Sequence, residues 1–106
     1  MLLFKKKFLP AIRSGEKTQT IRLWKFRHMR SGQRSYIPGI GYIRINSVDP
    51  VEIDSLTDAD AVPDGFSTAA ALQHELRTIY GEKLSAGYQA FRITFACEPQ
   101  AAVPKP

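Results

Sequence analysis

Apolar side chains occupy every second position in two segments, and this alternation restricts the fold more than any other feature of the sequence. Phe91, Ile93 and Phe95 form the later series, and Ile43 and Ile45 form the earlier one. A period of two places the apolar residues of a segment on one face of a β-strand. Half-buried strands of this kind are typical of an antiparallel sheet with one face against a core.

The remaining strand candidates are short and are joined by local turns. We predict strands over residues 2–4, 18–24, 34–37, 41–47, 51–53 and 88–96. Strands and helices do not alternate regularly, and no strand is followed by a glycine-rich phosphate loop. The pattern therefore argues against a doubly wound fold and favours an α+β fold.

Two helices accompany these strands. A short helix over residues 8–13 is expected to end before Gly15, because glycine takes the positive φ of a helix terminus without strain. Residues 56–61 predict a short helical turn. A longer helix is expected to begin after Ser67, a good N-cap, and to end at Gly81. Its apolar stripe consists of Leu72, Leu76, Ile79 and Tyr80. Such a stripe indicates a helix packed against the core.

Length and composition predict one domain. The 106 residues are 43% hydrophobic, which is enough to fill one core. We expect the domain to span residues 1–97, and we expect residues 98–106 to form a flexible tail because they contain few large apolar groups. Cys97 is the only cysteine, so no intrachain disulfide is expected.

The sequence predicts neither a membrane span nor a secretory signal. No apolar run approaches the roughly 20 residues that a span needs. The opening segment 1–4 turns basic where a signal peptide would continue apolar. We therefore expect a cytoplasmic protein that does not enter the membrane, and the sequence leaves its oligomeric state open.

Positive charge is concentrated in the first third of the chain. Residues 1–34 contain ten of the fifteen Lys and Arg residues and one acid, which gives this segment a charge of +9 and the remainder −4. Clustered cations produce a local positive potential that attracts phosphates. The segment predicts a polyanionic partner such as RNA or a nucleotide, although a solvated basic face has the same composition.

A lysine, two threonines and an arginine follow the short helix directly. Thr20 and Arg22 share one face of the predicted strand, and they point together into a cleft if Ile21 on the other face is buried. Lys17 lies on the preceding turn, where loops held by rigid elements usually carry binding or chemistry. The alternative is an edge strand whose threonines reflect β-propensity alone.

A basic loop follows this strand. Lys25, Arg27 and Arg30 are interleaved with the aromatic residues Trp24 and Phe26. Cations and aromatic rings in one loop suit contacts with phosphates and stacking on unpaired bases. The alternative is that the aromatic residues anchor the loop in the core.

No metal or cofactor is predicted. The two histidines, His28 and His74, are far apart in the sequence, and the acids lack the clustering of metal ligands. This argues against a metal-dependent nuclease.

Four elements together resemble an ASCH domain of the PUA-like superfamily. They are Gly15-x-Lys17-Thr18-x-Thr20-x-Arg22 after the short helix, the Gly32-Gln33 loop, Asp64-Gly65-Phe66-Ser67 before the long helix, and Tyr88-Gln89-Ala90-Phe91 in the last strand. The resemblance covers residues 2–96. It implies a small β-barrel of about five to six mostly antiparallel strands, a short and a longer helix, and a basic cleft that binds RNA or nucleotides.

Small bacterial members of this family are amidohydrolases that remove the acetyl group from N4-acetylcytidine with a lysine, a threonine and a glutamate. The resemblance places Lys17 and Thr20 at the first two positions. Asp64 stands where the family has glutamate, and its side chain is one methylene shorter.

Two functions are compatible with these residues. In the first, the chain binds RNA or a modified nucleoside or nucleotide in a basic cleft around Lys17, Thr20 and Arg22 without turnover. In the second, it is an amidohydrolase that deacylates such a nucleoside with Lys17, Thr20 and Asp64. The residues assigned to ligand binding are Lys5, Lys6, Lys7, Lys17, Thr18, Arg22, Lys25, Arg27 and Arg30.

Overall fold

The computed structural model describes residues 1–98. Its helices are α1 (Leu9–Ser14), α2 (Asp58–Asp64) and α3 (Ala69–Ser85), with single 3₁₀ turns over Lys6–Phe8 and Ile53–Ser55. Its strands are β1 (Gln19–Trp24), β2 (Arg34–Ile37), β3 (Gly41–Val51) and β4 (Gln89–Cys97). Apart from residue 98, the predicted tail lies outside the described residues. Within residues 1–98, no helix combines the length and apolar character that a membrane crossing requires.

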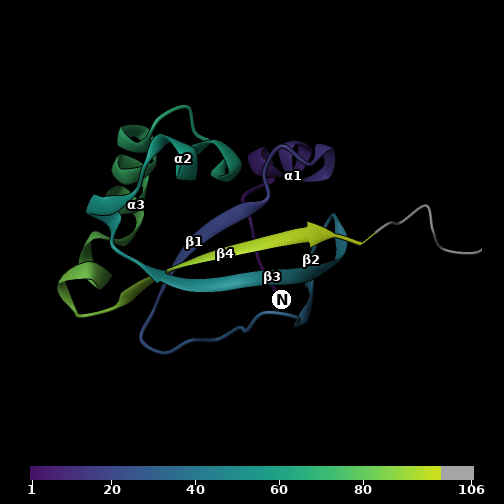
Figure 1. Ribbon diagram of the computed structural model, residues 1–106, viewed down its shortest axis with the longest axis horizontal. Helices are drawn as coiled ribbons and strands as arrows, with labels where there is room; N and C mark the ends of the chain where they lie inside the picture. Colours follow the sequence, from purple (N-terminus) through teal and green to yellow (C-terminus); the bar gives the residue numbers. More distant parts are fainter. Residues whose placement is uncertain (99–106) are drawn as a thin grey trace, which may run out of the picture.

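The four strands form one antiparallel sheet in the order β1-β4-β3-β2 (Figure 1). β4, which carries the strongest alternation, lies inside the sheet and pairs with β1 from Gln19 opposite Thr94 to Trp24 opposite Gln89. β1 is therefore an edge strand. The α+β class predicted from the sequence is confirmed.

The described residues form four strands rather than the expected five to six. Residues 51–53 do not form a separate strand, because β3 itself extends to Val51 and the chain then enters a 3₁₀ turn. Residues 2–4 are not a strand either. The Leu2 N–H donates to the Tyr36 carbonyl at 2.9 Å, but the chain then turns away into the 3₁₀ turn before α1.

Apolar side chains are buried on both faces of the sheet. The first core comprises Leu2, Ile12, Met29, Ile37, Ile43, Ile45, Val48, Phe91, Ile93 and Phe95. The second core comprises Ile21, Leu23, Ile53, Leu56, Ala61, Leu72, Leu76 and Ala90, and it joins the sheet to α2 and α3 (Figure 1). Full burial of one such aliphatic side chain stabilises a fold by about 1.5–3 kcal/mol. The burial of Ile21 agrees with the predicted division of β1 into two faces.

The long helix α3 begins and ends later than predicted. Its N-cap is Thr68 rather than Ser67, because the Thr68 hydroxyl accepts a hydrogen bond from the Ala71 N–H at 3.1 Å. The helix also continues beyond Gly81 for more than a turn. A glycine inside a helix costs about 0.5–1 kcal/mol, and the packing of Leu84 on the second core offsets that cost.

Two glycines end the helices that flank the lysine motif. α1 ends at Gly15, which has a φ of 86°, as the sequence predicted. α2 is longer than the short helical turn predicted over residues 56–61, and it ends at Gly65 with a φ of 97°. Only glycine takes such values readily, so both chain reversals depend on the missing side chain.

Backbone hydrogen bonds hold the motif between these two helices. The Lys17 N–H donates to the Ala11 carbonyl in α1 at 3.0 Å, and the Thr18 N–H donates to the Pro63 carbonyl in α2 at 2.8 Å. The chain from α1 to β1 is thereby tied to the last turn of α2, whose final residue is Asp64.

Candidate active site

A cavity of about 220 Å³ lies along the edge strand β1. Its walls come from residues 3–8, from β1, from the end of α2 and from α3. The charged residues and the one threonine that line it are Lys5, Lys17, Thr20, Arg22, Asp64 and Glu75. The three residues that the family resemblance implicated in catalysis, Lys17, Thr20 and Asp64, therefore face one cavity.

Lys17 and Asp64 form a buried ion pair. The Lys17 Nζ lies 3.0 Å from the Asp64 Oδ1, and only 3% and 6% of the two side chains are exposed. The ammonium also donates a hydrogen bond to the Asp64 backbone carbonyl. Aspartate is thus long enough to reach the lysine in this chain, although it replaces the glutamate of the family pattern.

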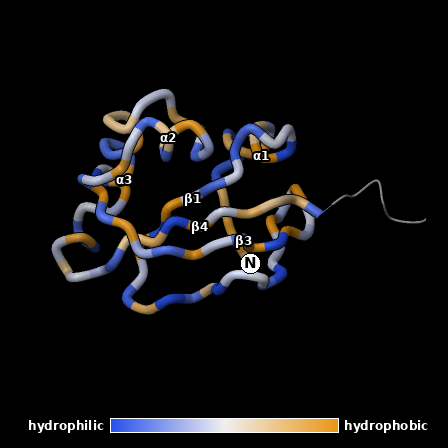
Figure 2. The backbone as a smooth tube through the Cα atoms, in the orientation of Figure 1, coloured by the Kyte–Doolittle hydropathy of each residue, from blue (hydrophilic) through white to orange (hydrophobic). Residues whose placement is uncertain are grey.

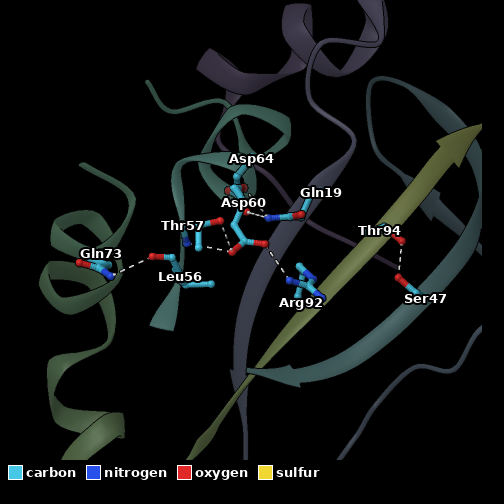
Figure 3. Close-up of polar contacts among 9 residues, drawn as sticks. All are labelled: Gln19, Ser47, Leu56, Thr57, Asp60, Asp64, Gln73, Arg92 and Thr94. Atoms are coloured by element: carbon cyan, nitrogen blue, oxygen red, sulfur yellow. Dashed lines mark hydrogen bonds and ion pairs between the residues drawn. The ribbon is translucent and has the colours of Figure 1, made fainter. Parts of the chain in front are cut away.

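Gln19 completes the hydrogen bonds of Asp64. Its Nε2 donates to the Asp64 Oδ2 at 3.1 Å and to the Asp60 carbonyl at 2.9 Å, and Figure 3 shows its side chain reaching α2 from β1. Sequence reasoning assigned Gln19 no role. Its place on the same strand face as the buried Ile21 was the available signal, because a polar residue on a core face needs a partner.

Burial controls the electrostatics of the ion pair. Removal from water lowers the pKa of Lys17 from its ordinary 10.5, and the attraction of Asp64 opposes this shift. Burial raises the pKa of Asp64 above 3.8 against the opposing attraction of Lys17. The two pKa values therefore lie closer together than in water, and moving the proton from the amine to the carboxylate costs less.

Thr20 and Arg22 lie together, as the strand alternation predicted. The Arg22 Nε donates to the Thr20 Oγ1 at 3.1 Å, and its Nη2 donates to the Leu3 carbonyl at 2.5 Å. The threonine oxygen accepts this bond, so its own proton is free to be donated elsewhere. Burial lowers the pKa of Arg22 from 12.5, and the guanidinium still carries its charge at neutral pH.

Phenylalanine rings cover the cations of the cavity. The Lys17 Nζ lies 4.9 Å from the centre of the Phe8 ring and 5.7 Å from that of Phe4. The Arg22 Cζ lies 4.8 Å from the Phe4 ring centre. The negative face of an aromatic ring attracts a cation and excludes water from it. Sequence reasoning missed both rings, because they precede the motif on a segment that was expected to be a strand and a helix.

The other residues assigned to ligand binding are distributed around the cavity. Lys5, Lys6 and Lys7 are exposed near the start of α1, and of these Lys5 lines the cavity. Thr18 is half-buried and does not line it.

Lys25, Arg27 and Arg30 are exposed on the segment after β1, outside the cavity lining. Figure 2 shows this segment as largely hydrophilic. Trp24 packs on Phe91 with ring centres 5.5 Å apart, as the core alternative held, whereas Phe26 is 76% exposed.

The cavity holds no set of metal ligands. Within residues 1–98, no three His, Cys, Asp or Glu side chains are grouped closely enough to bind a metal ion. Asp64 pairs with Lys17, and Asp60 beside it on α2 accepts from Arg92 at 2.7 Å.

Comparison with known proteins identifies the fold. A hypothetical protein, PH0355, superposes with a TM-score of 0.75 and 14% identity over 91% of this chain and 95% of its own. An ASCH domain from Lactobacillus crispatus superposes with a TM-score of 0.69 and 17% identity over 83% of this chain and 68% of its own. The protein EF3133 of the DUF984 family from Enterococcus faecalis superposes with a TM-score of 0.66 and 15% identity over 86% of this chain and 69% of its own. No protein-family model and no curated protein matches the sequence. The chain has the fold of an ASCH domain.

Proposed function

We propose that this chain is an amidohydrolase that removes an acyl group from the exocyclic nitrogen of a pyrimidine nucleoside such as N4-acetylcytidine. The observation that carries the proposal is the convergence of Lys17, Thr20 and Asp64 on one cavity, with a buried ion pair between the lysine and the acid. The aromatic lining from Phe4 and Phe8 suits a planar base. Of the two functions that the sequence left open, amidohydrolase activity is the one that the resemblance to the small bacterial members of the family supports.

Lys17 acts as the general base in this proposal. Transfer of its proton to Asp64 leaves a neutral amine, and burial of both groups makes that transfer easier. The neutral amine takes the Thr20 proton as the hydroxyl oxygen attacks the acyl carbon. The hydrogen bond from Arg22 fixes that oxygen without occupying its proton.

Arg22 stabilises the negative oxygen of the tetrahedral intermediate, because a fixed cation in a dry site acts strongly on developing charge. The carbon–nitrogen bond then breaks, and the Lys17 ammonium returns the proton to the departing amino group. Water, deprotonated by the same amine, attacks the acyl-threonine and releases the carboxylic acid. The Lys17 ammonium gives the proton taken from water to the departing Thr20 oxygen, which restores the hydroxyl, and Asp64 then returns its proton to Lys17. The pyrimidine is left with its free amino group.

Substitution of Thr20 by valine tests this assignment. Valine keeps the shape and the β-propensity but lacks the nucleophile, so we expect kcat for N4-acetylcytidine to fall by at least about 10³-fold. Cytidine and acetate formation is measured by chromatography. Thr78→Val, which changes an exposed threonine of α3, is the matched control. Equal loss in both variants, or undiminished turnover in Thr20→Val, contradicts the nucleophile assignment.

Binding of RNA or a nucleotide without turnover is the second candidate function. The specific observation in its favour is the set of exposed cations that precede and follow β1 in the sequence. They are Lys5, Lys6 and Lys7 before it and Lys25, Arg27 and Arg30 after it. Binding through phosphates releases counterions, so the affinity for a labelled RNA is expected to fall steeply as salt rises. Fluorescence anisotropy at several salt concentrations measures this dependence. An affinity that is insensitive to salt rules out a binding surface built on these cations.

A further inference from the structure

The open edge of β1, the edge that does not pair with β4, carries backbone groups that point away from the sheet. The Phe95 N–H donates to the Thr18 carbonyl at 2.9 Å, directly before β1 begins. Along an antiparallel strand, residues bonded to the partner strand alternate with residues whose backbone groups point away from it. Thr20 and Arg22 follow Thr18 at intervals of two, so they bond to β4. The N–H and C=O of Ile21 therefore point toward the open edge.

These two backbone groups of Ile21 are buried without a partner. Only 3% of Ile21 is exposed. Among residues 1–98, no backbone or side-chain group forms a hydrogen bond with its N–H or its C=O. Nearly all buried backbone N–H and C=O groups of native proteins are paired. The edge of β1 at Ile21 thus offers one donor and one acceptor to a bound molecule.

The cavity passes along this open edge. Thr20 and Arg22 line it from one face of β1, and Ile21 lines it from the opposite face, on which the leucines of α3 pack. A cavity that touches side chains of both faces of a strand crosses one of its edges, and β4 covers the other edge of β1. Figure 1 shows β1 as the strand of the sheet next to the helices. The N–H and C=O of Ile21 therefore face the cavity.

The Ile21 N–H also lies beside the proposed nucleophile. The Ile21 nitrogen is bonded to the carbonyl carbon of Thr20, so only a few covalent bonds separate it from the Thr20 Oγ1. In α/β-hydrolases, the backbone N–H of the residue after the nucleophile is one of the donors to the oxyanion. An acyl carbon in contact with the Thr20 Oγ1 thus has its oxygen within reach of the Ile21 N–H.

We infer that the Ile21 N–H donates a hydrogen bond to the oxygen that becomes negative when Thr20 attacks the acyl carbon. The inference rests on the proposed function, and it adds a second donor to the Arg22 guanidinium. A donor that is held in a strand needs no reorganisation while the charge develops. The donor belongs to the backbone, so the test replaces a backbone atom.

The test replaces the Ile21 N–H by an oxygen atom, through chemical synthesis of the chain with the α-hydroxy acid analogue of isoleucine at this position. The side chain is kept, and β4 loses no donor because the Ile21 N–H points away from it. We expect kcat for N4-acetylcytidine to fall by about 10²- to 10³-fold, the usual loss for one oxyanion donor. KM is expected to stay nearly unchanged, because the hydrogen bond strengthens in the transition state.

The same exchange at Leu23 is the matched control. Leu23 is the next residue of β1 whose backbone groups point to the open edge, it is also 3% exposed, and it does not line the cavity. Both exchanges weaken a preceding carbonyl that accepts from β4, so thermal unfolding is expected to show similar stability for the two variants. An equal fall of kcat in both variants, or an unchanged kcat in the Ile21 variant, overturns the inference.

A nucleoside with a thioacetyl group in place of the acetyl group gives a second measurement. Sulfur is a weak hydrogen-bond acceptor, so the ratio of kcat/KM for the acetyl and thioacetyl nucleosides includes the bond to the Ile21 N–H. The ratio is expected to fall in the Ile21 variant and to stay constant in the Leu23 variant. The same ratio in both variants and in the unchanged protein contradicts the bond.

Failure of the inference and failure of the proposed function give different results. If the unchanged protein forms no cytidine from N4-acetylcytidine, the amidohydrolase proposal fails and the inference fails with it. If the unchanged protein forms cytidine and the Ile21 variant does so at the same rate, only the inference fails.

Discussion

Replacement of Lys17 by methionine is expected to lower kcat for N4-acetylcytidine by about 10²- to 10⁴-fold, the usual contribution of a general base. Methionine keeps most of the length and apolar character of the lysine stem but cannot accept the Thr20 proton. Single-turnover formation of cytidine, followed by chromatography, measures the loss. Arg44→Met removes a cation outside the cavity lining and serves as the control. If Lys17→Met forms cytidine at the rate of the unchanged protein, Lys17 is not the general base.

The pH dependence of kcat also tests whether Lys17 is the general base. The Lys17 amine is neutral in two forms: one in which Asp64 holds the proton, whose share is independent of pH, and one in which the pair has lost that proton to water. The share of the second form increases with pH, so activity is expected to rise further as pH passes through the pKa of Lys17 in the enzyme–substrate complex. Because burial lowers that pKa, the rise is expected below the ordinary value of 10.5. A profile that rises only near 10.5 contradicts a buried lysine base.

Replacement of Asp64 by alanine is expected to lower the free energy of unfolding by about 3–5 kcal/mol, because it leaves the Lys17 ammonium buried without its partner. The two side chains are 3% and 6% exposed, so water cannot replace the lost carboxylate without opening the site. Urea denaturation followed by circular dichroism measures the change. Asp49→Ala, an exposed acid on β3, is the control, and it is expected to stay within about 0.5 kcal/mol of the unchanged protein.

The double variant Lys17→Met with Asp64→Leu tests whether the loss of stability in Asp64→Ala comes from the unpaired buried charge of Lys17. Apolar residues of similar volume often replace a buried ion pair without loss of stability. We therefore expect the double variant to be more stable than Asp64→Ala alone, and to be inactive. A double variant as unstable as the sum of the two single changes shows that the residues do not act as a pair.

Local sequence signals predicted the elements that carry the site. Gly15 ends α1 as its backbone freedom predicted. The alternation of Phe91, Ile93 and Phe95 predicted β4, and both Ile93 and Phe95 are almost completely buried. The exact limits of α3 were wrong, because Ser67 and Thr68 are both good N-caps and the helix continues through Gly81 where its packing offsets the cost of glycine.

The sequence by itself determined the places of the four strands that form the sheet and the basic first third, and the family resemblance added Lys17, Thr20 and Asp64 as a candidate set. Only the tertiary structure decided that Asp64 reaches Lys17, 47 residues earlier in the chain. It also supplied Gln19 as the partner of the acid and the phenylalanine rings over the cations. Period and spacing describe neighbours along one element, whereas this ion pair depends on how α1, α2 and β1 pack. The positive φ of Gly15 was predicted from the sequence, whereas that of Gly65 and the contact between the two turns appear only in the tertiary structure.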